Sequence, residues 1–125
     1  MRIPSIVDFN VMKSIAMVIP IPPGKTDAVR RLARAIMKDR KKEFVAGEKR
    51  LKVTRECWFL QSSPQGDVLI EYAEGVDLEK AMAASMKAKD EFSFWYNKEV
   101  KAIFGVDAKD LGKGPLPELL LSYGI

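Results

Sequence analysis

The chain has 125 residues, and its 21 Lys and Arg against 17 Asp and Glu give a net charge of +4. The absence of His excludes a His-dependent catalytic triad and His ligands to haem or zinc. A single Cys excludes an internal disulfide and a cysteine-ligated cluster, and we expect neither a metal nor a cofactor. With 47% hydrophobic and 30% charged residues, the sequence is typical of one globular domain covering residues 1–125.

The longest apolar stretch, Ile15–Pro23, contains three prolines and is far shorter than the ~20 residues that cross a bilayer. No small-residue cleavage pattern follows it, so a signal peptide is not expected. A lone Cys suits a reducing compartment. We therefore expect a cytoplasmic protein with no membrane partner.

The first half of the chain predicts a strand and then a long helix. Residues 14–21 are rich in Ile, Val and Met, which favours a strand. The helix begins near Thr26, is extended by Phe44 and Leu51, and is expected to end near Gly47. Its buried stripe has the three- and four-residue spacing of one helix face and comprises Val29, Leu32, Ala33, Ile36 and Met37.

Residues 55–62 and 67–73 predict a β-hairpin, because Ser63-Pro64-Gln65-Gly66 between them is favourable turn sequence. Pairing through this turn sets Leu60 opposite Leu69. One face of the hairpin is more uniformly apolar, and we expect that face to pack against the helices. It carries Cys57, Phe59, Val68, Ile70 and Tyr72, whereas the face expected to stay uncovered carries Glu56, Trp58, Leu60, Leu69 and Glu71.

The second half predicts two more helices and a final strand. Asp77 is expected to cap the first of these helices, a break near Asp90 separates them, and Gly105 ends the second. Residues 106–125 are interpreted as a loop and a final strand at 118–123, and residues 1–13 as an irregular lead-in. The inner helix faces are expected to carry Leu78, Ala81, Met82, Ser85 and Met86, then Phe92, Trp95, Tyr96, Val100, Ile103 and Phe104.

The predicted fold class is α+β, with the βαββαβ order of the ferredoxin-like arrangement. Such a domain has an antiparallel sheet with helices on one face, and its other face needs a cover. On the predicted register, that face shows Trp58, Leu60 and Leu69. We expect a second copy to cover it, so that two sheets form a dimeric α/β barrel.

Four segments, spread over most of the range 14–123, carry a likeness to known proteins: IPPGKTDAVRRL, VTRECWFLQSSPQGDVLIEY, EVKAIFGVD and PELLL. With these segments the chain resembles the dimeric α/β-barrel superfamily of ferredoxin-like proteins. Within it, the chain is similar to a small family of bacterial and archaeal proteins of unknown function. The resemblance implies a homodimer and a cavity within or beside the barrel, but no known reaction.

Better-studied members of this superfamily include cofactor-poor monooxygenases and haem-degrading monooxygenases. The haem-degrading members use a His to hold the iron, with Asn and Trp nearby. This sequence has Trp58, Trp95 and Asn97 but no His. It therefore departs from their pattern at the residue that haem chemistry needs.

Glu56 and Glu71 are the candidate catalytic residues, because the predicted register places both beside Trp58 on one sheet face. A carboxylate next to an indole in a dry site has a raised pKa and serves as a general acid or base. The alternative interpretation is that both glutamates form ion pairs in a subunit interface. The candidate ligand-binding residues, suited to a small apolar or acidic ligand, are Trp58, Leu60, Leu69, Phe94, Trp95 and Tyr96.

Charge is concentrated between Lys25 and Arg55, which carry 12 basic and 4 acidic residues. This stretch could bind nucleic acid or acidic lipid, or be a solvated helix face. Between Arg30 and Lys42, where the basic residues are densest, no aromatic side chain is interleaved, and so a nucleic-acid partner is not expected. The basic patch comprises Arg30, Arg31, Arg34, Lys38, Arg40, Lys41 and Lys42.

The sequence favours a small-molecule-binding homodimer of unknown function. One alternative is a cofactor-independent oxygenase or isomerase that uses Glu56 or Glu71 as a base. The others are a nucleic-acid-binding protein and a purely structural or regulatory dimer. A binder or enzyme should keep a cavity with convergent polar groups, whereas a scaffold should fill that space with side chains.

Overall fold

The structure is a computed structural model that describes residues 11–111 and 114–124. Within these ranges the chain is α+β, with one three-stranded antiparallel sheet and four α-helices. A short 3-10 turn, η1 (Ala108–Asp110), follows the last helix. The elements in chain order are β1 (Ser14–Pro20), α2 (Thr26–Met37), α3 (Lys41–Arg50), β2 (Val53–Ser63), β3 (Gly66–Gly75), α4 (Leu78–Lys87) and α5 (Glu91–Phe104).

The sheet has the order β1-β3-β2, so the hairpin strand β3 lies in the centre and β2 forms one edge. The predicted hairpin register is confirmed, because Leu60 pairs with Leu69 and Trp58 pairs with Glu71. Gly66 closes the turn at φ 123°, a conformation that side chains disfavour. The local turn chemistry therefore determines which residues of β2 and β3 face each other.

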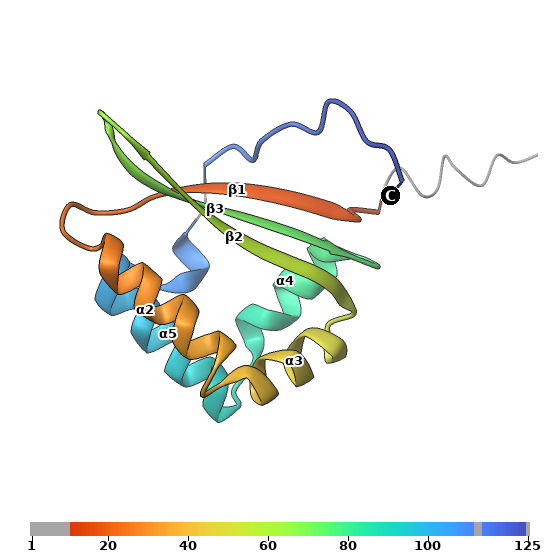
Figure 1. Cartoon of the computed structure of the whole chain (residues 1–125). Coiled ribbons are helices and arrows are strands. Elements are labelled where there is room, and N and C mark those ends of the chain that lie inside the picture. The colour runs from red at the N-terminus through yellow and green to blue at the C-terminus, as the bar shows by residue number, and fades with distance from the viewer. Residues whose placement is uncertain (1–10, 112–113, 125) are drawn as a thin grey trace, which may run out of the picture.

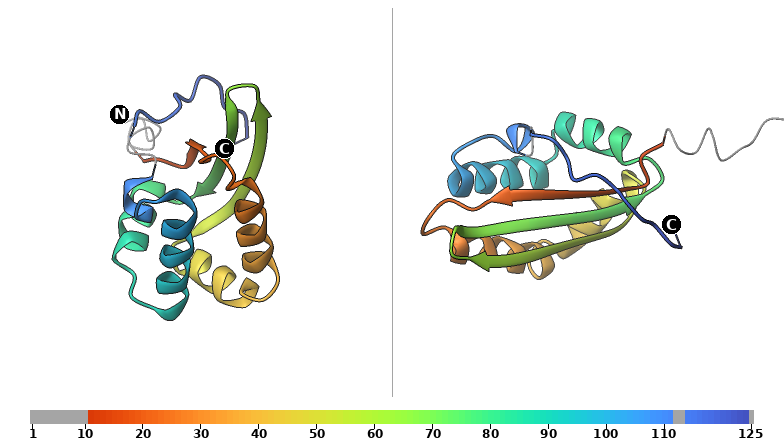
Figure 2. Two further views of the ribbon diagram at one scale, coloured as in Figure 1. Left: turned by 90° about the vertical axis from the view of Figure 1, so that its left-hand side faces the viewer. Right: turned by 90° about the horizontal axis from the view of Figure 1, so that it is seen from above.

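All four helices lie on one side of the sheet (Figure 1), and the turned views show the same two-layer arrangement (Figure 2). The core forms between the layers, where apolar side chains of β1, β3, α2 and α5 meet. No helix in the described ranges is both long and apolar enough to cross a membrane. The buried core comprises Ile19, Ile21, Val29, Leu32, Ile36, Leu69, Val100 and Ile103.

The predicted assignment of the two sheet faces is wrong. Leu69 is only 3% exposed, and Trp58 and Leu60 pack against the core beneath the sheet. Phe59, on the opposite face, is 56% exposed, and Val18, on the same face of β1 beyond Ile70, is 50% exposed. The reason lies in β1, whose register puts its bulkier residues on the same face as Leu69. Cys57, Val68, Ile70 and Tyr72 consequently share the uncovered face with Phe59.

The single long helix predicted from Thr26 onward is two helices. The chain turns at residues 38–40, where the backbone N–H of Arg40 donates to Ala35 O at 3.0 Å. This turn lets the Arg40 guanidinium reach Glu91 Oε2 at 2.6 Å and keeps α3 packed against β2. Gly47, which was expected to end the helix, lies within α3, and Met37 is exposed.

The predicted caps of the last two helices are confirmed. The Asp77 carboxylate accepts a hydrogen bond from the backbone N–H of Lys80 at 3.2 Å, and that of Asp90 accepts one from Ser93 at 3.2 Å. Gly105 ends α5 in the left-handed conformation at φ 76°. On α4, however, the predicted inner residues Ser85 and Met86 are exposed, because α4 packs only through its first turns.

The predicted final strand at 118–123 is not formed. Residues 114–124 contain neither helix nor strand and cross over the uncovered face of the sheet (Figure 2). Leu120 and Leu121 in this segment are 85% and 83% exposed. Of the predicted lead-in, residues 1–10 lie outside the described residues, and 11–13 form neither helix nor strand.

Gly75 at the end of β3 provides a test of the packing between sheet and helices. A Cβ on this residue would lie 2.8 Å from Lys52 O and 2.9 Å from Leu78 Cδ2. We expect Gly75→Ala to lower the free energy of unfolding by about 1–3 kcal/mol, because backbone must move to admit the methyl group. Urea unfolding followed by circular dichroism measures the change.

Gly114 provides the matched control, since a Cβ there meets nothing within 4 Å. Gly114→Ala should leave the urea midpoint unchanged. Equal midpoints for both variants would show that the backbone around Gly75 is not tightly packed.

Candidate functional site

A groove of about 300 Å³ lies between α2 and the edge strand β2. Its floor is apolar and is made by Trp58, Leu60 and Leu69, three of the predicted ligand-binding residues. Phe59 of β2 also lines it, together with Val29, Arg30, Ala33 and Arg34 of α2. We call this cavity the α2–β2 groove. It joins two residue sets that the sequence analysis treated separately, the apolar sheet residues and the basic helix.

Local structure explains why these side chains meet. Trp58 and Leu60 are two residues apart on β2 and therefore point to the same side of the sheet, where Leu69 of β3 pairs with Leu60. On α2, Arg30 and Arg34 are four residues apart and share one face of the helix. Since β2 is an edge strand, no further strand of residues 11–111 or 114–124 covers the groove on its outer side.

The two arginines of the α2–β2 groove differ in their partners. Arg30 Nη1 lies 2.7 Å from Asp27 Oδ1, so its charge is already balanced on the helix surface. Arg34 has no acidic partner among the described residues. The groove therefore combines an apolar floor with one unbalanced guanidinium, which has five N–H donors.

Beside the groove, three carboxyl groups gather under the sheet. The indole N–H of Trp58 donates to Glu56 Oε2 at 2.8 Å. Glu71 is the residue that pairs with Trp58 across the hairpin. Glu48 of α3 shares a hydrogen bond with Glu56. We call Glu48, Glu56 and Glu71 the carboxyl cluster.

Crowding of acidic groups in a dry environment changes their acidity. Burial, together with the charge of Glu56, raises the pKa of Glu71 to about 7. Burial, the charge of Glu56 and the hydrogen bond to it raise the pKa of Glu48 to about 8. The pKa of Tyr96 is raised well above its usual value by burial and by the charges of the three carboxylates. The cluster thus holds protons near neutral pH.

Sequence reasoning placed Glu56 and Glu71 together but missed Glu48. A detectable signal was present, because Glu48 lies four residues after Phe44 and three before Leu51. These two residues were expected to extend the buried helix stripe, and a carboxylate on that stripe must point inward. Among the described residues, no group of three or more acidic or Cys side chains is arranged to hold a metal ion.

The aromatic candidates on α5 do not line the α2–β2 groove. Tyr96 packs against the core and stacks on Phe92 with ring centroids 6.4 Å apart. Trp95 also packs against the core, and the Arg40 guanidinium lies 4.6 Å from its ring centroid. Phe94 is exposed.

The predicted basic patch is divided among three places. Arg30 and Arg34 line the α2–β2 groove, and Arg31 is exposed on α2. Arg40 contacts Glu43, Glu91 and Trp95. The lysines Lys38, Lys41 and Lys42 surround a second groove on α3.

The carboxyl cluster predicts how stability depends on pH. Glu71 and Glu48 have folded pKa values of about 7 and about 8, above their ordinary value of 4.5, so the folded state binds protons more tightly. The free energy of unfolding should therefore fall as pH rises through this window. Glu71→Gln removes the charge and should stabilise the protein by about 2 kcal/mol at pH near 8, with little effect near pH 5.

Urea unfolding at the two pH values measures this difference. Glu79→Gln, on the exposed surface of α4, removes one negative charge outside the cluster and should leave the pH slope unchanged. A wild-type stability that increases from pH 5 to pH 8 would contradict the buried cluster.

Asp67 affects stability at lower pH. A hydrogen bond from Thr26 is the main cause that lowers its pKa, so its protonation changes the free energy of unfolding only below the pH range of the cluster.

Comparison with known proteins assigns no family to this chain. No protein-family model matches the sequence, and no curated protein matches it either. The function must therefore be inferred from the arrangement of the α2–β2 groove, the carboxyl cluster and the charged surfaces.

Proposed function

We propose that the protein binds a small apolar carboxylate in the α2–β2 groove and acts as a homodimer. The observation that carries the proposal is the placement of the unbalanced Arg34 guanidinium beside the apolar floor of Trp58, Leu60 and Leu69. An apolar tail would cover the floor, and the carboxylate would pair with Arg34. The ligand class agrees with the small apolar or acidic ligand expected from the sequence.

The size and chemistry of the α2–β2 groove support this ligand class. Its volume of about 300 Å³ is at the lower end of the range for small-molecule sites. The Trp58 N–H already donates to Glu56, so the indole offers the ligand mainly its apolar ring. Burying apolar ligand surface contributes ~25 cal/mol per Å². Arg34 adds a charged hydrogen-bond donor, which selects for an anionic end.

The carboxyl cluster supports a binding role for the groove better than a catalytic one. Glu56 and Glu71 are not among the side chains that line the α2–β2 groove. Glu56 instead holds Trp58 through the 2.8 Å hydrogen bond. Proton transfer by Glu56 or Glu71 to a bound ligand stays an untested prediction. We assign the two carboxylates to positioning the groove floor.

The uncovered sheet face supports the homodimer. It presents Val18 and Phe59, which are half exposed, with Ile70 between them and Cys57 next to Phe59 on the same face of β2. Residues 114–124, whose leucines are exposed, form a segment that crosses over this face (Figure 2). The order of β1, helices, β2, β3 and helices is also compatible with the proposed ferredoxin-like arrangement. A second copy packed face to face would remove this apolar surface from water.

Binding of octanoate and octan-1-ol tests the ligand class. The two molecules have the same alkyl chain, and only octanoate can pair with Arg34. We expect the wild type to prefer octanoate by about tenfold in isothermal titration calorimetry, and Arg34→Gln to abolish that preference. Octanol binding should be unchanged in Arg34→Gln, because the apolar floor is intact.

Arg31→Gln is the matched control, since it removes the same charge from α2 at a residue outside the groove. It should keep the preference for octanoate. The proposal fails if octanol binds as tightly as octanoate, or if Arg31→Gln and Arg34→Gln have equal effects.

Val18→Lys tests the homodimer without touching the α2–β2 groove. It places a charge on the edge strand β1, within the apolar surface of the uncovered face, so the mass measured by analytical ultracentrifugation should fall from that of a dimer to about 14 kDa. Met86→Lys, at a similarly exposed residue of α4, should remain dimeric. A monomeric wild type at all concentrations would contradict the proposal.

A further inference from the structure

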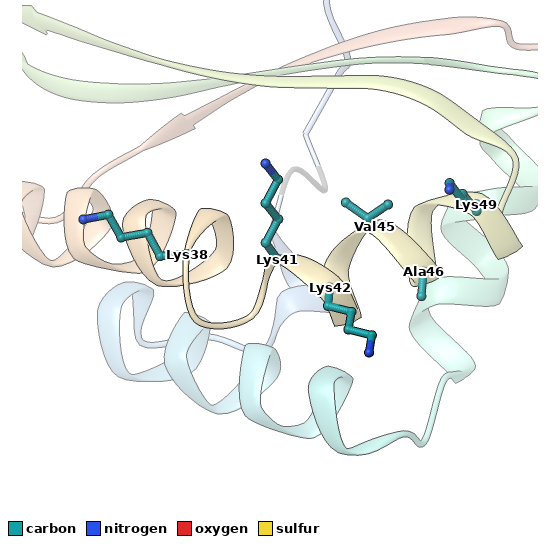
Figure 3. Close-up of a pocket in the computed structure, with 6 residues that line it drawn as sticks. All are labelled: Lys38, Lys41, Lys42, Val45, Ala46 and Lys49. Atoms are coloured by element: carbon teal, nitrogen blue, oxygen red, sulfur yellow. The ribbon is translucent and has the colours of Figure 1, made fainter.

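The outer face of α3 carries a groove of about 610 Å³ rimmed by lysines. Figure 3 shows the side chains that line it, with the lysines fanning out around Val45 and Ala46. Three of the lysines lie on α3 and the fourth, Lys38, directly follows α2; all four are exposed. We call this surface the lysine groove. It is lined by Lys38, Lys41, Lys42, Val45, Ala46 and Lys49.

The sequence of α3 explains why these residues gather on one side. Lys41, Val45 and Lys49 follow one another at four-residue intervals, and Lys42 and Ala46 repeat the same spacing on the adjacent row. Phe44 and Glu48 lie on other rows and point to the interior. From Lys41 to Lys49 the helix rises about 12 Å, so the charges form an elongated row rather than a point.

Nearby acidic side chains do not neutralise this row. Glu43 and Glu91 both bond to Arg40, at 3.4 and 2.6 Å. Asp39 is exposed in the turn before α3 and does not line the groove. In the ranges that the structure describes, none of the four lysines of the groove forms an ion pair. Glu43 and Glu91 thus pair with Arg40 and not with the lysines, whose ammonium groups can contact an anionic partner.

The positive surface continues along α2. Lys38 follows Arg34 by four residues, and α2 and α3 succeed each other beneath the edge strand β2 (Figure 1). The lysine groove is therefore one end of a basic belt that runs along two helices. A long, flexible polyanion fits such a belt better than a single small anion does.

We propose that the lysine groove binds the phosphate backbone of a single-stranded nucleic acid. Its charged side chains are all donors, and a phosphodiester backbone presents mainly acceptors. A peptide presents N–H donors as well, and no side chain of the groove accepts hydrogen bonds. No aromatic side chain lines the groove for base stacking, so binding is independent of sequence and RNA and DNA bind alike.

The sequence alone predicted no nucleic-acid partner, because no aromatic residue is interleaved between Arg30 and Lys42. The gathering of the four lysines around Val45 and Ala46 and the contact of Glu43 with Arg40 are features of the folded chain. The lysine groove shares no lining residue with the α2–β2 groove. Failure of either proposal therefore leaves the other standing.

Fluorescence anisotropy with labelled single strands of about 12 nucleotides, one RNA and one DNA, tests the proposal. The variant combines Lys41→Gln, Lys42→Gln and Lys49→Gln. We expect its Kd to rise at least about tenfold at about 50 mM salt. The slope of log Kd against log salt should also fall by about 2, since each lost phosphate contact contributes about 0.7.

The control combines Lys80→Gln, Lys87→Gln and Lys109→Gln, which remove the same charge from α4 and η1. Its Kd should stay within about twofold of the wild type, and arginine at the three groove positions should restore binding. The proposal is overturned if the wild type binds neither strand, or if the control loses as much affinity. Tighter binding of a poly-glutamate peptide than of either strand would instead identify an acidic protein partner.

Discussion

The burial of Trp58 under the sheet is the constraint on which the rest of the structure depends. Its ring packs against the core from an edge strand, and its N–H is satisfied by Glu56 on the same strand. Because side chains alternate along a strand, this choice turns Glu71 inward and Phe59 outward. The orientation of Trp58 toward the helices therefore determines the floor of the α2–β2 groove, the position of the carboxyl cluster and the apolar outer face of the sheet.

Local signals in the sequence were sufficient to predict the β-hairpin and the N-terminal caps of the last two helices. Pro64 and Gly66 specify the turn, and Asp77 and Asp90 cap the helices that follow them, so each signal acts within a few residues. The orientation of the hairpin depended on a distant strand. Ile15, Met17 and Ile19 of β1 lie on the same face of the sheet as Trp58. On β1 the opposite face carries the smaller Ser14, Ala16 and Val18, so the face with Trp58 packs against the helices.

The candidate site was predictable in part for the same reason. The predicted hairpin register placed Trp58, Leu60 and Leu69 on one face. The packing of α2 against the edge of the sheet, which the sequence did not predict, adds Arg34 to the lining of the α2–β2 groove. The turn at residues 38–40 was also beyond local reasoning, because its stabilising partners, Glu91 and Trp95, come from α5. The predicted strand at 118–123 failed because an apolar run forms a strand only where a neighbouring edge pairs with it.

Phe59 belongs to two surfaces at once. It lines the α2–β2 groove, and more than half of it is exposed toward the uncovered face of the sheet. A molecule that covers this face changes the rim of the groove, and a ligand in the groove changes the surface that the covering molecule meets. If the proposed ligand and the proposed second copy both bind, this shared residue would link the two associations thermodynamically, with the same magnitude in both directions. Ligand concentration would then act as a control on assembly.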